Sequence, residues 1–372
     1  MLSQRTETAL LLAYIIFDNT STIVLLRLWG ELSPHYSYFL ALVWALIFAA
    51  VFNIVNYVTF KFIPQQQQSL ERYPETEQRQ TSTILVQLAV ALLYCINFSC
   101  VAWANPHLRG PVQVVLSQTP IAAAVVVSSL VWHEQYDRLS WMGCLAVTIG
   151  CLLAGVVPHI LNTRSAQQAE ASVGNALLYV LGSLPLGIIP LLYERYFRRR
   201  LLQSLARTSI YLLFCILLMF PTFWAAAGDS PVAALEKMKS ALLCSAESSD
   251  ECTLGTLALI GSGVCAALNV HAQARMSVNR TGTLAAMAMA LSPFLADLIF
   301  ALRFLMGRHY REVASLWSVL GALLAAFGVA LFTFREQKKK RAAEERQFLD
   351  QLLAGSADYE DSASFEASHL LT

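Results

Sequence analysis

Charged residues are scarce in this chain. Asp, Glu, Lys and Arg make up 14% of its 372 residues, against roughly 25% in typical soluble domains. Hydrophobic residues, in contrast, make up 56%. A soluble domain of this length needs a larger share of charged side chains to cover its surface. This composition therefore excludes an ordinary soluble protein and indicates a chain that lies mostly within a lipid bilayer.

The motifs of common enzyme classes are also missing. The sequence has no Cys and His residues at metal-site spacing, no Gly-x-Ser-x-Gly elbow and no glycine-rich phosphate loop. It has no pair of acids on one helix, as an intramembrane aspartyl protease needs. A net charge of +1 gives no basis for a nucleic-acid partner. We therefore expect no enzyme, no cofactor and no nucleic acid.

Long apolar runs dominate what is present. A helix needs about 20 mostly apolar residues to cross the hydrocarbon core of a bilayer. Ten stretches meet this requirement, so we expect an all-α membrane protein with ten transmembrane helices. The expected spans are 8–28, 38–58, 83–104, 110–132, 140–158, 173–194, 206–227, 253–274, 281–302 and 313–334.

The distribution of basic residues predicts the orientation of these spans. When both termini are placed in the cytosol, eight of the 26 Lys and Arg residues fall on the opposite side. The remaining majority includes the runs 198–200 and 338–341, and cytosolic loops carry such an excess. Only seven residues precede the first span, so we expect that span to act as a signal anchor that is not cleaved. The tail at 335–372 is expected to be cytosolic and disordered.

The two halves of the sequence share a pattern. Pro120 and Pro293 each begin an apolar stretch, and each stretch is followed by a charged turn and a glycine-containing span. We therefore predict two five-span repeats, at 8–158 and 173–334, within a single transporter domain. An odd number of spans inverts the second copy, as in many secondary transporters. Coincidence among Ala-rich and Gly-rich helices is the alternative explanation.

The loop at 228–252 is expected to face the lumen. Its apolar residues recur at helical spacing after Pro231, which predicts a short helix in the membrane interface. Cys244 and Cys252 are the two cysteines of this loop, and an oxidising lumen favours a disulfide between them. The alternative is two free thiols.

The end of the tail carries a candidate sorting signal. Glu366 precedes Leu370 and Leu371 by four residues, which is the spacing of an acidic dileucine signal read by sorting adaptors. Such a signal is an address and not an anchor. It predicts a lysosomal or vacuolar membrane, although the spacing also arises by chance.

Polar side chains inside the spans are the candidate binding residues. The stretch AYIIFDNTSTIVLL at 13–26 carries five polar residues in a row. An ionisable group in a span costs at least ~2.5 kcal/mol on insertion scales, so it is usually kept where it faces a pocket or a partner. A carboxyl near the bilayer midplane favours its neutral form, so Asp18 is our candidate proton site. The expected substrate-binding residues are Asp18, Asn19, Thr20, Asn97, Gln118, Asn269 and His271, and interhelical packing is the alternative role for each.

Two segments of the sequence resemble one known family. The run LLYERYFRRRLL at 191–202 and the run RTGTLAAMAMALSPFLADLIFALRFLMGRHYREVASLWSVLG at 280–321 resemble the chloroquine-resistance-transporter family of the drug/metabolite transporter superfamily. The resemblance implies ten spans in two inverted repeats. It also implies proton-coupled export of peptides, amino acids, thiols or other cationic metabolites from an acidic vacuole or lysosome to the cytosol.

The same resemblance suggests roles for individual residues. Asn19 and Thr20 look like the pair in span one that governs drug handling in this family. Glu194 matches a family acid at the cytosolic end of span six and is our candidate gate residue. The chain differs from the family in span eight, where Ala266 stands in place of an acid, and in its luminal loop, which has two cysteines in place of four.

Two other classes of function stay open. A Golgi nucleotide-sugar transporter of the same superfamily is the alternative, and it is expected to present Lys or Arg to the phosphates of its substrate. The expected spans contain no Lys. A receptor or scaffold is the third class, and it needs neither the duplicated proline-led spans nor a buried acid.

Overall fold

The computed structural model describes residues 4–32, 37–62, 77–104, 119–133, 136–162, 167–197, 200–219, 250–279 and 282–301, with scattered positions at 221–239 and 316–338. Nearly all of these residues are helical, and none of them lies in a β-strand. Six of the described helices are long and apolar enough to cross a membrane. The all-α class is therefore confirmed for this part of the chain, and the helices indicate a multi-pass membrane protein.

Most helices coincide with the expected spans. Three of them begin five or six residues before the expected spans, at Glu77, Gln167 and Leu201 in place of 83, 173 and 206. Arg200 is the residue that precedes the helix at Leu201, so this helix begins directly after the arginines at 198–200. The helices are α1 (Gln4–Leu32), α2 (Ser37–Phe62), α4 (Glu77–Ala104), α6 (Thr119–Val131), α7 (Arg138–Asn162), α8 (Gln167–Tyr196), α9 (Leu201–Leu218), α12 (Asp250–Asn279) and α13 (Gly282–Ala301).

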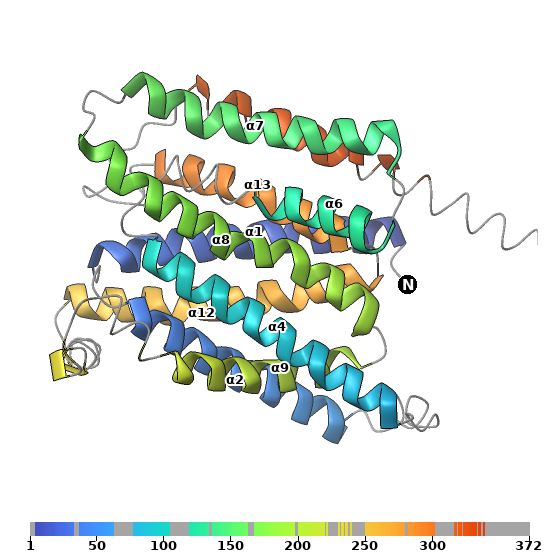
Figure 1. Ribbon diagram of the computed structural model, residues 1–372, viewed down its shortest axis with the longest axis vertical. Coiled ribbons are helices and arrows are strands. Elements are labelled where there is room, and N and C mark those ends of the chain that lie inside the picture. Colours follow the sequence, from blue (N-terminus) through green and yellow to red (C-terminus); the bar gives the residue numbers. More distant parts are fainter. Residues whose placement is uncertain are drawn as a thin grey trace, which may run out of the picture.

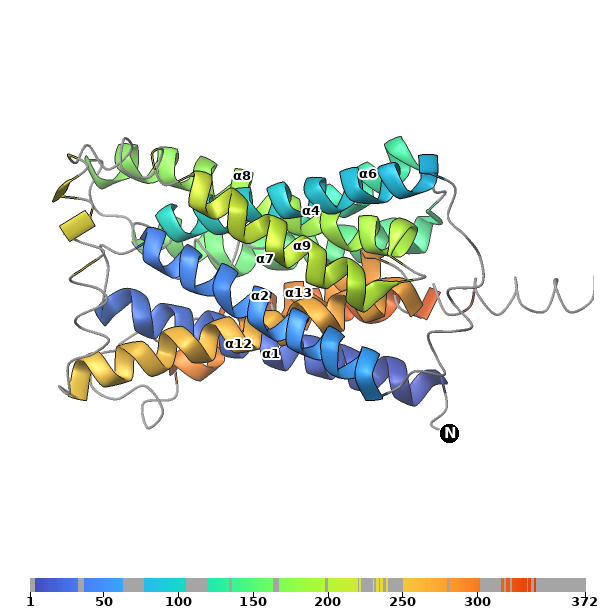
Figure 2. The ribbon, with the colours of Figure 1, turned by 90° about the horizontal axis from the view of Figure 1, so that it is seen from below.

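The helices form one elongated bundle. Helices α2 and α9 pack together at one edge, and α7 lies at the opposite edge beside the helical segment Val319–Phe332 (Figure 1). Between these edges, α4, α6 and α8 lie on one side of the bundle, and α1, α12 and α13 lie on the other (Figure 2). Each group is held by direct contacts, because α8 packs on α4 and α6, while α1 packs on α12 and α13.

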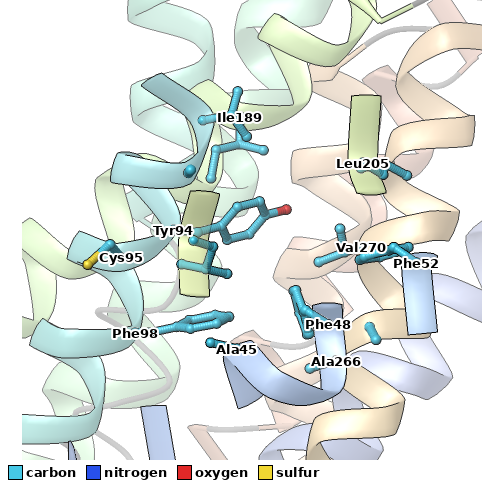
Figure 3. Packing of buried hydrophobic residues seen from close by; sticks show 14 of the residues in the cluster. Ala45, Phe48, Phe52, Tyr94, Cys95, Phe98, Ile189, Leu205, Ala266 and Val270 are labelled. Atoms are coloured by element: carbon cyan, nitrogen blue, oxygen red, sulfur yellow. The ribbon is translucent and has the colours of Figure 1, made fainter. Parts of the chain in front are cut away.

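An aromatic cluster fills the core between α2 and α4. Phe48 of α2 makes edge-to-face contacts with Phe98 and Tyr94 of α4, with ring centroids 5.5 and 6.2 Å apart (Figure 3). The hydroxyl of Tyr94 forms a 2.9 Å hydrogen bond with the hydroxyl of Tyr193 on α8. Both tyrosines are buried, so this bond satisfies two polar atoms that cannot reach water.

Glycines allow α7 to approach the segment Val319–Phe332 closely. A Cβ atom added to Gly143 would lie 2.8 Å from the carbonyl oxygen of Gly328, and one added to Gly150 would lie 2.5 Å from that of Gly321. Small residues let helices in a bilayer come this close. The glycines that suggested a sequence repeat therefore pack against one another in space.

Candidate functional site

The polar run in the middle of α1 is buried. Asp18, Thr20 and Thr22 are 4%, 3% and 7% exposed. The hydroxyl of Thr22 donates to the backbone carbonyl of Asp18 at 2.8 Å, and that of Thr20 donates to Ile16 at 2.6 Å. Such bonds to the preceding turn satisfy a hydroxyl without breaking the helix. They explain how α1 keeps these residues in a span.

Two side chains of this run also bind α13. The amide of Asn19 donates to the carbonyl of Met289 at 3.4 Å. The hydroxyl of Thr20 shares its single proton between the carbonyl of Ile16 and that of Ser292, whose oxygen lies 3.2 Å away. Residue 293 is a proline, which has no N–H to bond the carbonyl four residues earlier. That carbonyl belongs to Met289, so Asn19 replaces the donor that Pro293 cannot supply.

Helix α12 binds α1 from another direction. The amide nitrogen of Asn269 donates to the carbonyl of Ile15 at 3.1 Å. Its amide oxygen accepts a hydrogen bond from the side-chain amide of Gln273, and the hydroxyl of Ser277 donates to the backbone carbonyl of Gln273 at 2.7 Å. Asn269, Gln273 and Ser277 are at most 5% exposed. We call these three residues the α12 ladder.

Asp18 lies between these two sets of contacts. Its titratable neighbours are Tyr14, one turn earlier on α1, and Cys265 on α12. Within the described residues, no donor lies within hydrogen-bonding distance of its Oδ2 atom, and no ion pair joins it to His271. Asp18 is therefore a buried carboxyl with an available oxygen and no cationic partner among these residues. A buried acid in this setting is suited to binding a proton or a cationic group.

The remaining expected binding residues lie elsewhere. Asn97 of α4 donates to the carbonyl of Gly182 on α8 at 2.8 Å, and α4 makes no extensive contact with α1 in the described residues. His271 is half-buried on α12, and the charged group that acts on it is Arg275. The structure thus brings Asp18, Asn19, Thr20 and Asn269 together, and it places Asn97 at a second interface.

Glu194 lies at one end of the bundle, where α8 meets α13. Its carboxylate accepts a 2.6 Å hydrogen bond from the backbone N–H of Gly282, the first residue of α13. A carboxylate is favourable at a helix N-terminus because the free N–H groups and the helix dipole attract negative charge. A Cβ atom added to Gly282 would lie 2.6 Å from the carbonyl carbon of Pro190 and 2.7 Å from the nitrogen of Leu191. We call the contact of Gly282 with Pro190, Leu191 and Glu194 the α13 seat.

A second group of contacts joins the helices at the same end of the bundle. Tyr136 lies in the turn after α6, and its hydroxyl bonds the hydroxyl of Ser128 on α6 at 2.7 Å and that of Thr283 on α13 at 3.0 Å. Arg195 of α8 lies over the ring of Trp132, 5.5 Å from its centroid. Helices α6, α8 and α13 are therefore joined at the Glu194 end.

The α12 ladder, the α13 seat and the contacts of Tyr136 add residues that our sequence analysis did not single out. These are Gln273, Ser277, Tyr136 and Gly282. A sequence signal exists for the ladder, because Asn269, Gln273 and Ser277 recur every four residues and so share one helix face. No comparable signal exists for the seat, because it joins a carboxylate to the backbone.

Several predictions concern residues outside the described part of the chain. Gln118, Cys244, Glu366, Leu370 and Leu371 all lie there. Cys252 belongs to the first turn of α12, but its side chain is not among those described. Near the expected interfacial helix, the N–H of Ala233 donates to the hydroxyl of Ser230 at 3.2 Å, as a capping residue allows.

Comparisons with known proteins concern the fold alone. No protein-family model matches the chain, and no curated protein matches it. Among solved structures 28 chains match, and one of them, titled only "Crystal structure of protein", has 14% sequence identity and a TM-score of 0.53. The match covers 90% of this chain and 98% of that chain. In the described residues, no cluster of three or more His, Cys, Asp or Glu could hold a metal ion.

Proposed function

We propose that this chain is a proton-coupled secondary transporter with ten transmembrane helices in two inverted five-helix repeats. It exports a small solute, such as a peptide, amino acid, thiol or other cationic metabolite, from an acidic vacuole or lysosome to the cytosol. The observation that carries this proposal is Asp18, a buried carboxyl that retains an available oxygen at the centre of α1.

Matched hydrogen bonds support the inverted repeats. In the proposed arrangement α4 and α12 are the third helices of the two repeats, while α1 and α8 are the first. Asn269 of α12 donates to a backbone carbonyl of α1, and Asn97 of α4 donates to a backbone carbonyl of α8. Each third helix thus uses an asparagine to bind the first helix of the other repeat. The two second helices, α2 and α9, pack on each other, as a two-fold relation requires.

An asymmetry between the repeats supports alternating access. Helix α8 packs on α12 and α13, and these contacts include the α13 seat. Its counterpart α1 makes no extensive contact with α4 or α6 in the described residues. In an inverted-repeat transporter, such paired contacts form in turn on the two sides of a central site. We interpret the present arrangement as a state closed at the Glu194 end, with Glu194 as a gate residue.

Asp18 is the proposed proton site. Burial disfavours a charged carboxyl, so Asp18 takes a proton readily from an acidic lumen. The titratable groups that face it are Tyr14 and Cys265, while Met289 and Ser292, which α13 presents to the neighbouring residues, do not titrate. Each pH unit of gradient then supplies about 1.4 kcal/mol per transported proton.

The chemistry around Asp18 favours a neutral or cationic solute. The groups at this interface are a carboxyl, amides and hydroxyls, and none of the described side chains among them is a Lys or Arg. A Golgi nucleotide-sugar transporter, the alternative, needs a cation for its phosphates. No residue of this interface favours that alternative or an enzymatic activity.

The test is uptake into proteoliposomes with an imposed pH gradient, using peptides, amino acids, thiols and nucleotide sugars as candidate solutes. Asp18→Asn keeps the size of the side chain and removes its titration. We expect the pH-driven accumulation of solute by this variant to be at least tenfold lower than that of the wild type. The variant should still exchange solute across the membrane. Asp137→Asn is the matched control, because Asp137 is exposed and pairs with Arg335. Unchanged pH dependence in Asp18→Asn would refute the proposed role of Asp18.

The proposed location depends on the dileucine signal. We expect the double variant Leu370→Ala and Leu371→Ala to move the protein from the vacuolar or lysosomal membrane to the cell surface. Microscopy of tagged protein measures this change. A double variant that keeps its location would show that sorting adaptors do not read these residues.

A further inference from the structure

The amide of Asn269 has a fixed orientation. Its oxygen is bonded to the Nε2 atom of Gln273, so its nitrogen must point the other way, toward the carbonyl of Ile15. Asn269 and Gln273 are 3% and 5% exposed, so water does not offer either amide an alternative partner. If Gln273 did not donate, the oxygen and nitrogen of Asn269 could exchange places. The oxygen of Asn269 would then face the oxygen of Ile15, and the two acceptors would repel.

The α12 ladder lies next to Asp18. Cys265, Asn269, Gln273 and Ser277 recur every four residues and so follow one face of α12. The first of them, Cys265, lies beside Asp18, and the next, Asn269, binds α1 one turn before Asp18. From Cys265 to Ser277 the face extends about 18 Å at a rise of about 1.5 Å per residue. This face thus connects the level of Asp18 with the end of α12 that precedes the α13 seat.

The corresponding interface has no such ladder. Asn97 of α4 binds the carbonyl of Gly182 on α8, but the residue four positions later is Val101. Valine cannot orient an amide. Gly182 also lies against Val101 and Cys100, so apolar contacts determine how closely α8 approaches α4 at this point. A second, orienting amide is therefore particular to the interface that contains Asp18.

We propose that Gln273 is a positioning residue that orients Asn269 and thereby holds α12 against α1 at the level of Asp18. Its assignment to coupling depends on the proposed function, in which Asp18 carries the proton. The hydrogen bond from Asn269 to the carbonyl of Ile15 keeps α1 and α12 together as one unit while the transporter changes between its two access states. Asp18 then stays shielded, and a proton cannot leave without movement of the solute.

Cys265 reports on this interface without any transport. It is half-buried beside Asp18, and it becomes more reactive when α12 separates from α1. The probe is dithiodipyridine, a disulfide reagent that reacts with thiols at acidic pH. The rate at which it modifies Cys265 is measured at pH 5 in the full-length protein, by peptide mass spectrometry without reduction.

Gln273→Met keeps the length of the side chain and removes its donor. An interhelical hydrogen bond in a bilayer changes an equilibrium about threefold on average and up to about 18-fold. We therefore expect Cys265 to react three to 18 times faster in this variant. Gln87→Met is the matched control, because Gln87 is also buried and binds Ser204 between α4 and α9. We expect the control to leave the rate at Cys265 unchanged.

Gln273→Glu tests whether the hydrogen-bond donor that orients Asn269 matters, apart from the packing of the side chain. At pH 5 a buried glutamic acid is protonated, and its O–H can donate to Asn269 as the amide does. We expect this variant to react at the wild-type rate. The proposal is overturned if Gln273→Met also reacts at the wild-type rate, or if Gln273→Glu reacts as fast as Gln273→Met.

A transport measurement then tests the coupling. We expect Gln273→Met to accumulate less solute in a pH gradient while it exchanges solute at the wild-type rate, whereas a purely structural role lowers both in proportion. Proportional loss overturns the coupling role of Gln273. If the wild-type protein shows no pH-driven uptake, the proposed function fails instead, and the rates at Cys265 still decide whether Gln273 positions Asn269.

Discussion

The α13 seat makes Gly282→Ala the most direct perturbation of the closed end. The added Cβ atom would lie 2.6 Å from the carbonyl carbon of Pro190 and 2.7 Å from its oxygen. These are backbone atoms of α8, so they cannot move without moving the helix. Overpacking of this kind costs typically about 1–3 kcal/mol. Because the cost falls only on the state in which α13 touches α8, the population of that state should fall about five- to 150-fold relative to the other.

Opening of this end can be measured at Met276. Its side chain is fully buried in a cluster with Leu191 and Leu284, near the end of α12. In a Met276→Cys background we expect Gly282→Ala to raise the rate of modification by a charged methanethiosulfonate reagent about five- to 150-fold. Gly174→Ala is the matched control on α8, because nothing lies within 4 Å of its added Cβ. It also corrects for the higher helix propensity of alanine.

Equal rates in the two alanine variants would refute this reasoning. Such a result would mean either that α8 and α13 shift at no cost, or that the contact persists in both states. Slower modification in Gly282→Ala would refute it as well, because it would mean that the closed state is stabilised. The background Met276→Cys alone gives the reference rate for the two alanine variants.

Two further predictions concern the core and the luminal loop. Tyr94→Phe and Tyr193→Phe should each cost about 1–3 kcal/mol of stability, because each leaves one buried hydroxyl without its partner. The double variant should cost less than the two together, and unfolding in detergent measures this difference; additive losses would contradict the bond. Cys244 and Cys252 should appear as a linked pair in a non-reducing peptide map, and two alkylated thiols in the mature protein would contradict the disulfide.

The helices and the burial of Asp18 could be predicted from the sequence because both follow from the solvent. A bilayer requires long apolar segments with internally bonded backbones, and it keeps an acid only where protein surrounds it. Helices α1, α2 and α4 accordingly contain the first three expected spans. The early start of α9 could not be predicted in this way. The span requirement locates only the apolar centre of a helix, and the residues at 201–205 lie before the expected span although the structure includes them in α9.

The partners of the polar side chains were harder to predict because they are backbone atoms. Asn19, Thr20, Asn97 and Asn269 all donate to carbonyl groups of other helices. A carbonyl is present at every residue, so no residue type identifies the one that is used. Pro293 is the exception, since a proline predicts that the carbonyl four residues earlier lacks its helical donor.

The residues of the polar run in the middle of α1 differ in whether they can donate to a backbone carbonyl. Asn19, Thr20 and Thr22 donate to backbone carbonyls, and these bonds hold α1 in place against α13 and within its own helix. Asp18 has no proton to donate when charged, so it cannot bind a carbonyl in the same way. Protonation gives it a donor and removes its charge in one step. Asp18 is therefore the residue of the run whose bonding must change with its charge, which is the property that a proton-coupled site requires.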